Sequence, residues 1–260
     1  MRGERLNDGL SVYAVGEGPP LVTVPGLGMG ADLAVKVPPL TGFNAKMLAQ
    51  GFKRRVHTIN RPLRAPEGMT IADLAGWYAK ALRERFDGPV DVMGTSAGGV
   101  TALQLAMDHP DVVRRLIVCI AASRPGDEGK RTLLWLVQKE RRGRYHLWES
   151  SGLATRGPLR LVVYAAYRVA GLVSGAKRAQ GEGRVVEAAQ DWDVTERLGE
   201  ITAPTLVIAG TRDALIPAAR AEATAAGIGD SRLLMIEGGD HLSTMLNRRV
   251  SPAIREFLNG

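Results

Sequence analysis

Short apolar runs that alternate with longer helical patterns constrain the fold of this 260-residue chain more than any other feature. The runs are continuous, which is typical of parallel strands that are covered on both faces. They lie at residues 21–24, 56–59, 90–93, 116–120, 205–209 and 233–236. Residues 10–15 have the pattern of one arm of an N-terminal antiparallel hairpin. The alternation predicts an α/β fold with a mostly parallel, doubly wound sheet.

Residues 124–190 interrupt this alternation, because one helix would be enough to join the strands on either side. Helical patterns occupy the segment instead, over 130–148, 159–173 and about 184–190. Insertions of this length in a compact domain are often functional. We therefore expect a core domain of residues 1–123 and 191–260 and a helical cap, or lid, of residues 124–190. An ordinary decoration of the sheet without a role at a site is the alternative.

The positive charge of the chain is concentrated in this expected cap. The net charge is +7, and residues 124–190 hold 13 Lys and Arg against 6 Asp and Glu. The rest of the chain holds 21 of each sign. A solvated basic helix face is one explanation. Our hypothesis is that the cap attracts an anionic or acidic-carrier-borne substrate, or rests on an anionic surface. Because zinc-finger spacing, RNP-like aromatic motifs and long basic runs are absent from the sequence, we expect no nucleic-acid partner.

Cysteine content and hydropathy limit the setting in which the chain works. A single cysteine, Cys119, excludes an internal disulfide framework and a multi-cysteine metal cluster. The N-terminal residues have no apolar core of a secretory signal. The longest apolar stretch, 159–173, contains Arg160 and Arg168 and is too short for a membrane span. We expect a cytoplasmic protein without a transmembrane segment, and the sequence leaves the oligomeric state open.

A candidate nucleophile lies at the end of one apolar run. Gly94-Thr-Ser96-Ala-Gly98 has the G-x-S-x-G pattern, follows residues 90–93 and precedes a predicted helix over 97–108. The pentapeptide alone is a weak signal, but a strand-turn-helix context is where a nucleophile elbow occurs. The helix start behind Ser96 would offer free N–H groups and a positive dipole end to a developing anion.

A serine hydroxyl needs a base, and the base needs an orienting group. His241 follows the last apolar run in a glycine-rich loop, and catalytic groups gather at the carboxyl edge of an open α/β sheet. Asp213 follows residues 205–209 at the same edge and would fix the imidazole tautomer. Asp240 is a rival acid, but a residue adjacent to His241 in sequence rarely points at its ring.

The remaining histidines and the cysteine have less specific contexts. His57 lies inside a strand pattern, His109 ends a helix before Pro110, and His146 lies in the basic segment. We expect them to be structural or solvated. Cys119 lies within a strand pattern, and we expect it to be inert core.

The chain resembles the α/β-hydrolase superfamily over nearly its whole length. The resemblance rests on residues 24–28 (Val-Pro-Gly-Leu-Gly), 94–98, 201–217 and 238–241, and on Pro110 after the nucleophile helix. The order Ser96, Asp213, His241 is the order typical of this superfamily. The resemblance implies an eight-stranded sheet with an antiparallel second strand and a cap after the sixth strand.

The same resemblance implies an oxyanion hole made by the backbone N–H groups of Leu27 and Ala97. Many relatives have His-Gly in the loop before the first donor, whereas this chain has Pro25-Gly26, so the hydrogen bonding of the loop is expected to differ. The implied mechanism needs no metal and no organic cofactor. Because the elbow residue is serine, the dehalogenase-like and epoxide-hydrolase-like members, which use aspartate, are excluded.

These features predict a serine hydrolase that cleaves a carboxylic ester through a Ser96-His241-Asp213 triad and an acyl-enzyme. Two enzymatic alternatives share the triad: a thioesterase or acyltransferase acting on carrier-bound acyl chains, and a carbon–carbon bond hydrolase. A ligand-binding protein that has kept a hydrolase fold is a non-enzymatic alternative. The expected partner is a small ester or acyl substrate, apolar or anionic. Its identity, acyl length and stereochemistry are not encoded in any motif of the sequence.

Overall fold

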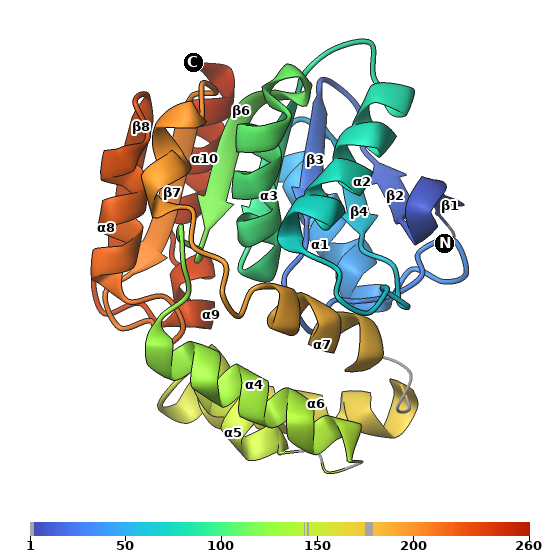
Figure 1. Ribbon diagram of the computed structural model, residues 1–260, viewed down its shortest axis with the longest axis vertical. Coiled ribbons are helices and arrows are strands. Elements are labelled where there is room, and N and C mark those ends of the chain that lie inside the picture. Colours follow the sequence, from blue (N-terminus) through green and yellow to red (C-terminus); the bar gives the residue numbers. More distant parts are fainter. Residues whose placement is uncertain (1–2, 143, 145, 175–178) are drawn as a thin grey trace.

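A twisted sheet of eight strands, in the order β1-β2-β4-β3-β5-β6-β7-β8, forms the centre of the protein (Figure 1). The computed structural model describes residues 3–142, 144, 146–174 and 179–260. The strands are β1 (Glu4–Arg5), β2 (Ser11–Val15), β3 (Pro20–Val24), β4 (Arg55–Asn60), β5 (Val90–Thr95), β6 (Val113–Cys119), β7 (Thr205–Gly210) and β8 (Ser231–Ile236). β2 runs antiparallel to β1 and β4, and the pairs from β4 to β8 are parallel. The α/β fold and the antiparallel second strand are confirmed.

Helices cover both faces of the sheet. They are α1 (Pro39–Phe52), α2 (Ile71–Arg85), α3 (Ala97–Asp108), α8 (Ala218–Gly227), α9 (His241–Met245) and α10 (Val250–Asn259), with short 3₁₀ turns at Asn7–Gly9, Pro110–Val112 and Thr195–Glu200. One apolar cluster packs α2, α3 and α8 against one face, and a second packs α1 and α10 against the other. This two-sided burial is the reason why the strand runs are continuously apolar.

Two elements differ from the sequence expectations. The apolar pattern 233–236 predicts a strand covered on both faces, but β8 is the edge strand of the sheet, and its residue Leu233 is 39% exposed. The expectation is wrong here because an edge strand is covered less completely than a central one. The sequence analysis does not predict α1. Its outer face carries the exposed apolar residues Leu40, Phe43 and Met47, so the helix lacks the alternation of apolar and polar faces that marks an amphipathic helix.

The segment 124–190 is helical. It contains α4 (Asp127–Arg141), α5 (Leu147–Ala154), α6 (Pro158–Ser174) and α7 (Ala179–Ala188). The predicted helix over 130–148 is wrong in its length: α4 ends at Arg141, where the Arg142 N–H turns back to the Lys139 carbonyl at 3.0 Å. Residues 143 and 145 of that prediction lie outside the described residues.

The helices of this segment lie beyond the carboxyl ends of the parallel strands. Figure 1 shows α4, α5 and α6 in a layer of their own, with α7 between this layer and the sheet. The parallel register aligns Val24, Gly94 and Val118 across β3, β5 and β6, so the loops that follow these strands leave from one edge. Within the described ranges, no helix combines the length and the hydropathy that a membrane crossing requires.

Candidate active site

The turn between β5 and α3 holds Ser96 in an unusual backbone conformation. Its φ is 54° and its ψ is −123°, a region that residues other than glycine rarely adopt. The flanking glycines are required by close approach: a Cβ on Gly94 would lie 2.5 Å from the Gly98 carbonyl oxygen, and a Cβ on Gly98 would overlap the carbonyl oxygen of Val24. The tight turn therefore presents the Ser96 side chain at the start of α3.

Ser96, His241 and Asp213 lie in one hydrogen-bonded chain. His241 Nε2 is 2.9 Å from Ser96 Oγ, and His241 Nδ1 is 2.7 Å from Asp213 Oδ2. The second carboxylate oxygen of Asp213 accepts hydrogen bonds from the N–H groups of Leu215 and Ile216 at 2.8 and 3.0 Å. The side chain of Asp213 is fully buried. These bonds fix the carboxylate, and the carboxylate in turn orients the imidazole ring.

Asp240 has a different role from the one a rival acid would have. Its carboxylate accepts hydrogen bonds from the Ser243 N–H at 2.8 Å, the Thr155 hydroxyl at 2.8 Å and the Arg156 N–H at 3.0 Å. Burial alone would raise the pKa of Asp240, but these bonds outweigh it and hold the pKa below its ordinary value. Asp240 therefore caps α9, which begins at His241, and joins that helix to the 124–190 segment.

The loop after β3 carries Leu27 and passes beside Ser96. A Cβ on Gly26 would lie 3.1 Å from the Ser96 Cβ, so the loop and the serine are adjacent. Ala97 is the first residue of α3, and the N–H groups of a helix's first turn have no intrahelical acceptor. Both Leu27 and Ala97 are partly buried against the core cluster around α3.

The last residue of β4, Asn60, and the residue after it, Arg61, hold this loop, and the sequence analysis did not single them out. Arg61, only 3% exposed, donates to the Pro25 carbonyl at 3.1 Å and, through Nη2, to the Gly26 carbonyl. Asn60 donates to the carbonyls of Met29 and Ala31 at 2.9 and 3.0 Å. The only sequence signal for this role is an Asn-Arg pair at the carboxyl end of a strand. These side chains supply loop hydrogen bonds in a chain that has Pro25-Gly26 in place of His-Gly.

A carboxylate from α7 reaches the same loop from the opposite side. Glu182 Oε1 accepts hydrogen bonds from the N–H groups of Gly28 and Gly30, each at 2.9 Å. Burial and the nearby charge of Glu182 raise the pKa of Glu140 on α4, so two acidic side chains lie close together at this contact. No local pattern predicts the contact, because more than 150 residues separate its partners.

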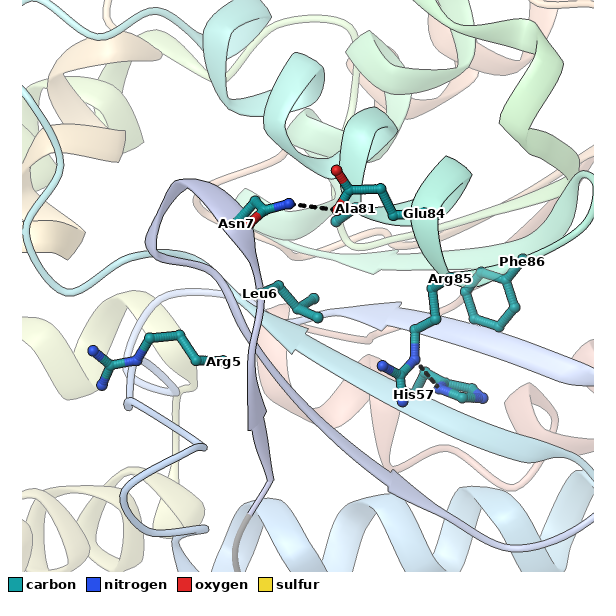
Figure 2. Close-up of a pocket in the computed structure, with 8 residues that line it drawn as sticks. All are labelled: Arg5, Leu6, Asn7, His57, Ala81, Glu84, Arg85 and Phe86. Atoms are coloured by element: carbon teal, nitrogen blue, oxygen red, sulfur yellow. Dashed lines mark hydrogen bonds between the residues drawn. The ribbon is translucent and has the colours of Figure 1, made fainter.

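The other histidines lie away from Ser96. His57 is buried beside Arg85, with its ring edge-on to Phe86 at 5.0 Å (Figure 2). Burial and the charges of Arg85 and Arg55 lower its pKa to about 4. The pocket drawn in Figure 2 is lined by residues of the N-terminal hairpin, β4 and α2, and none of them belongs to the Ser96 site. Cys119 is buried, and burial raises the pKa of its thiol to about 12.

No group of three or more His, Cys, Asp or Glu side chains in the described part of the chain is arranged to hold a metal ion.

The sheet order, the antiparallel second strand and the helices on both faces define an α/β hydrolase. A solved hydrolase from Pseudomonas aeruginosa PA01 has the same fold: its TM-score is 0.78 at 22% identity, over 99% of this chain and 98% of that one. The model of the family described as "Serine aminopeptidase, S33" matches residues 66–245, and the chain belongs to this family of α/β hydrolases.

Relatives by sequence are also hydrolases, but their names refer to different bonds. The chain is 30% identical over 210 residues to a putative carbamate hydrolase of Variovorax paradoxus, covering 76% of each chain. It is 31% identical over 175 residues to a poly(3-hydroxyalkanoate) depolymerase of Ectopseudomonas oleovorans, covering 66% of this chain and 61% of that protein. The comparisons support hydrolase activity on a small-molecule substrate and leave the bond undefined.

Proposed function

We propose that the protein is a serine hydrolase that cleaves a carboxylic ester, with Ser96 as nucleophile, His241 as base and Asp213 as the orienting acid. The observation that carries the proposal is the unbroken hydrogen-bonded chain from the buried Asp213 carboxylate through His241 to the Ser96 hydroxyl, with distances of 2.7 and 2.9 Å. Such a chain is the arrangement that activates a serine hydroxyl for attack.

In the first half of the reaction, His241 Nε2 accepts the Ser96 proton while Ser96 Oγ forms a bond to the ester carbonyl carbon. The carbonyl π electrons move onto the oxygen, and the resulting oxyanion accepts hydrogen bonds from the Leu27 and Ala97 N–H groups. When the tetrahedral intermediate collapses, the C–O bond to the alcohol breaks. The imidazolium of His241 donates its proton to the leaving oxygen, and an acyl-enzyme on Ser96 remains.

In the second half, water replaces the alcohol. His241 Nε2 takes a proton from the water as the hydroxide oxygen bonds to the acyl carbon. The second intermediate collapses with cleavage of the Ser96 ester, and His241 returns the proton to Ser96 Oγ. Asp213 stays ionised throughout and stabilises the imidazolium in both halves. The products are an alcohol and a carboxylic acid.

We extend the proposal to the domain organisation. Residues 124–190 act as the cap over the site, and residues 1–123 with 191–260 form the catalytic core. The position of α4 to α7 beyond the carboxyl ends of the strands supports this division (Figure 1). The hydrogen bonds from Thr155 and Arg156 to Asp240 support it as well, since they fasten the segment beside His241.

A carbamate is the second candidate substrate, favoured by the 30% identity to the putative carbamate hydrolase. The same attack on a carbonyl carbon would apply, with an amine as one eventual product. Matched aryl esters, aryl carbamates and acyl thioesters compare these bonds directly. We expect the highest kcat/KM for the ester, and a preference for the carbamate or the thioester would contradict the ester assignment.

Labelling by a fluorophosphonate probe tests the nucleophile. We expect the wild-type protein to be labelled and Ser96→Ala to lose both the label and ester turnover. Ser251→Ala, which changes an exposed serine on α10, is the matched control and should behave as wild type. Equal ester turnover by the wild-type protein and Ser96→Ala would overturn the proposal.

A further inference from the structure

The loop that carries Leu27 is held from two sides, by the core and by α7 of the 124–190 segment. We propose that Glu182 is a positioning residue: its carboxylate fixes the Gly26–Gly30 loop so that the Leu27 N–H points at the oxyanion. The inference rests on the proposed ester hydrolysis at Ser96, and it assigns a part of the oxyanion site to the cap.

The loop binds the Glu182 carboxylate through its backbone. Two backbone N–H groups, those of Gly28 and Gly30, converge on the same oxygen of Glu182 at 2.9 Å each. Hydrogen bonds to an ionised acceptor are stronger than neutral ones. A Cβ at position 30 would lie 2.7 Å from Glu182 Oε1, so a side chain there would displace the carboxylate.

Arg61 and Glu182 bind backbone atoms on either side of Leu27, whose N–H is the proposed oxyanion donor. The Leu27 N–H belongs to the peptide plane whose carbonyl is that of Gly26, and Arg61 donates to this carbonyl. The next peptide plane ends in the Gly28 N–H, which donates to Glu182. With both planes fixed, the two backbone torsions of Leu27 between them have little freedom. Oxyanion donors act through such preorganisation, because they must already point at the position where charge develops.

The position of Glu182 depends in turn on how α7 is seated. α7 packs against α4, and Glu187 on α7 forms an ion pair with Arg141 on α4 at 2.6 Å. Glu187 makes no recorded contact with the loop in the described part of the chain, which makes it a matched acidic control on the same helix. Because the Arg141 and Glu187 side chains are partly exposed, loss of their ion pair costs little, whereas a change at Glu182 removes the hydrogen bonds to the loop.

The first experiment compares Glu182→Ala, Glu182→Gln and Glu187→Ala in steady-state ester hydrolysis. Glu182→Ala is expected to lower kcat at least about tenfold with little change in KM, since loss of an oxyanion donor costs about 10²–10³ in kcat and here the donor is misplaced rather than removed. Inhibition by a trifluoromethyl ketone, which forms an oxyanion on Ser96, should weaken in parallel. Glu182→Gln keeps an acceptor oxygen and should recover most of kcat, and Glu187→Ala should stay near wild type.

A second measurement does not need turnover. Amide hydrogen exchange at Gly28 and Gly30 should speed up in Glu182→Ala and stay slow in Glu182→Gln. If Ser96→Ala is as active as wild type, the proposed function fails, and the exchange rates still decide whether Glu182 orders the loop. Unchanged exchange in Glu182→Ala would overturn the inference. So would a loss of kcat that is equal in Glu182→Ala and Glu187→Ala, or equal in the alanine and glutamine variants.

Discussion

At the scale of single residues, two residues near the proposed site have unusual backbone conformations that their surroundings impose. Ser96, which follows β5, has φ of 54°, and Ile120, which follows β6, also has a positive φ, 47°. Both are held by the sheet: the Ser96 N–H donates to the Cys119 carbonyl at 2.9 Å, and the Ile120 N–H donates to the Ile208 carbonyl at 2.7 Å. Conformations of this kind cost about 1–3 kcal/mol each and persist where the fold over-determines them.

Asp213→Asn tests the orienting acid. The variant keeps the shape of the side chain, but its amide can stabilise the wrong imidazole tautomer, and it lacks the charge that stabilises the imidazolium. We expect kcat for an ester to fall about 10⁴-fold, as is typical of this change in a Ser-His-Asp site. Steady-state kinetics at neutral pH measures the effect, and circular dichroism checks the fold.

The matched control for this prediction is Asp193→Asn, at an aspartate of intermediate exposure that contacts Thr195 and Arg124. It should retain wild-type kcat. An Asp213→Asn variant that stays within about threefold of wild type would contradict the assignment of Asp213 as the orienting acid, since that role accounts for a far larger factor.

At the scale of secondary-structure elements, helix starts and their caps position two side chains of the proposed triad. α3 starts directly after Ser96, and α9 starts at His241, so both residues lie at helix N-termini. The capping box of α9 joins Asp240 and Ser243 reciprocally, with the Asp240 N–H donating to the Ser243 hydroxyl at 2.9 Å. A helix of only five residues depends on such bonds for its orientation.

Asp240→Ala is expected to lower the free energy of unfolding at neutral pH by about 1–2 kcal/mol, the usual effect of losing an N-cap residue. Because the pKa of Asp240 is lowered in the folded state, its stabilising contribution is present above the unfolded pKa of about 4. The contribution disappears as the pH falls through the lower folded pKa. The difference between wild type and variant should therefore shrink in acid.

Urea denaturation at neutral pH and below about pH 4 measures this difference. Asp240→Asn is the control, because it retains an acceptor oxygen for the helix cap but does not titrate. A stability difference between wild type and Asp240→Ala that is the same at both pH values would show that the carboxylate charge does not contribute.

At the scale of the whole molecule, the net positive charge is confined to one part of the chain, the segment 124–190. The chain outside residues 124–190 is neutral in total, and the segment 124–190 holds the positive excess, with 13 basic against 6 acidic residues. Part of this charge is locally paired, as in the Arg141–Glu187 and Arg184–Glu187 contacts. The excess nevertheless belongs to the segment that we propose as the cap over Ser96, and a positive field there would raise the encounter rate with anions.

The proposed attraction of anionic substrates predicts a difference in salt dependence. For an ester with a carboxylate in its acyl part, kcat/KM should fall several-fold as ionic strength rises from about 0.01 M to about 1 M, because the screening length shortens from about 30 Å to about 3 Å. A neutral ester of the same length should show little change. Stopped-flow or initial-rate kinetics at both ionic strengths measures the ratio, and an equal fall for both substrates would remove electrostatic attraction as the cause.

Local patterns in the sequence are enough to predict several parts of the protein. Continuous apolar runs predict strands that are buried on both faces. Among the apolar runs, this prediction fails only at β8, because β8 lies at the edge of the sheet and no local pattern encodes that position. The helix 97–108 and the glycine turn before it are likewise encoded locally, in the spacing around Ser96. Asp213 and His241 each follow a strand run in the sequence, and in the structure the two side chains join Ser96 in one hydrogen-bonded chain. Their catalytic roles stay a prediction.

The groups that hold the proposed site come together through tertiary contacts. Arg61 reaches the Gly26–Gly30 loop from the end of β4 and Glu182 reaches it from α7, and neither has a pattern in the chain that points to that loop. The sequence offers Asp240 as a rival acid, and its contacts as a helix cap and with Thr155 follow from the packing of the helical segment. Local sequence fixes the strand and turn that carry a reactive side chain. The contacts that orient it join segments as far apart as 154 residues, and only the folded chain brings these together.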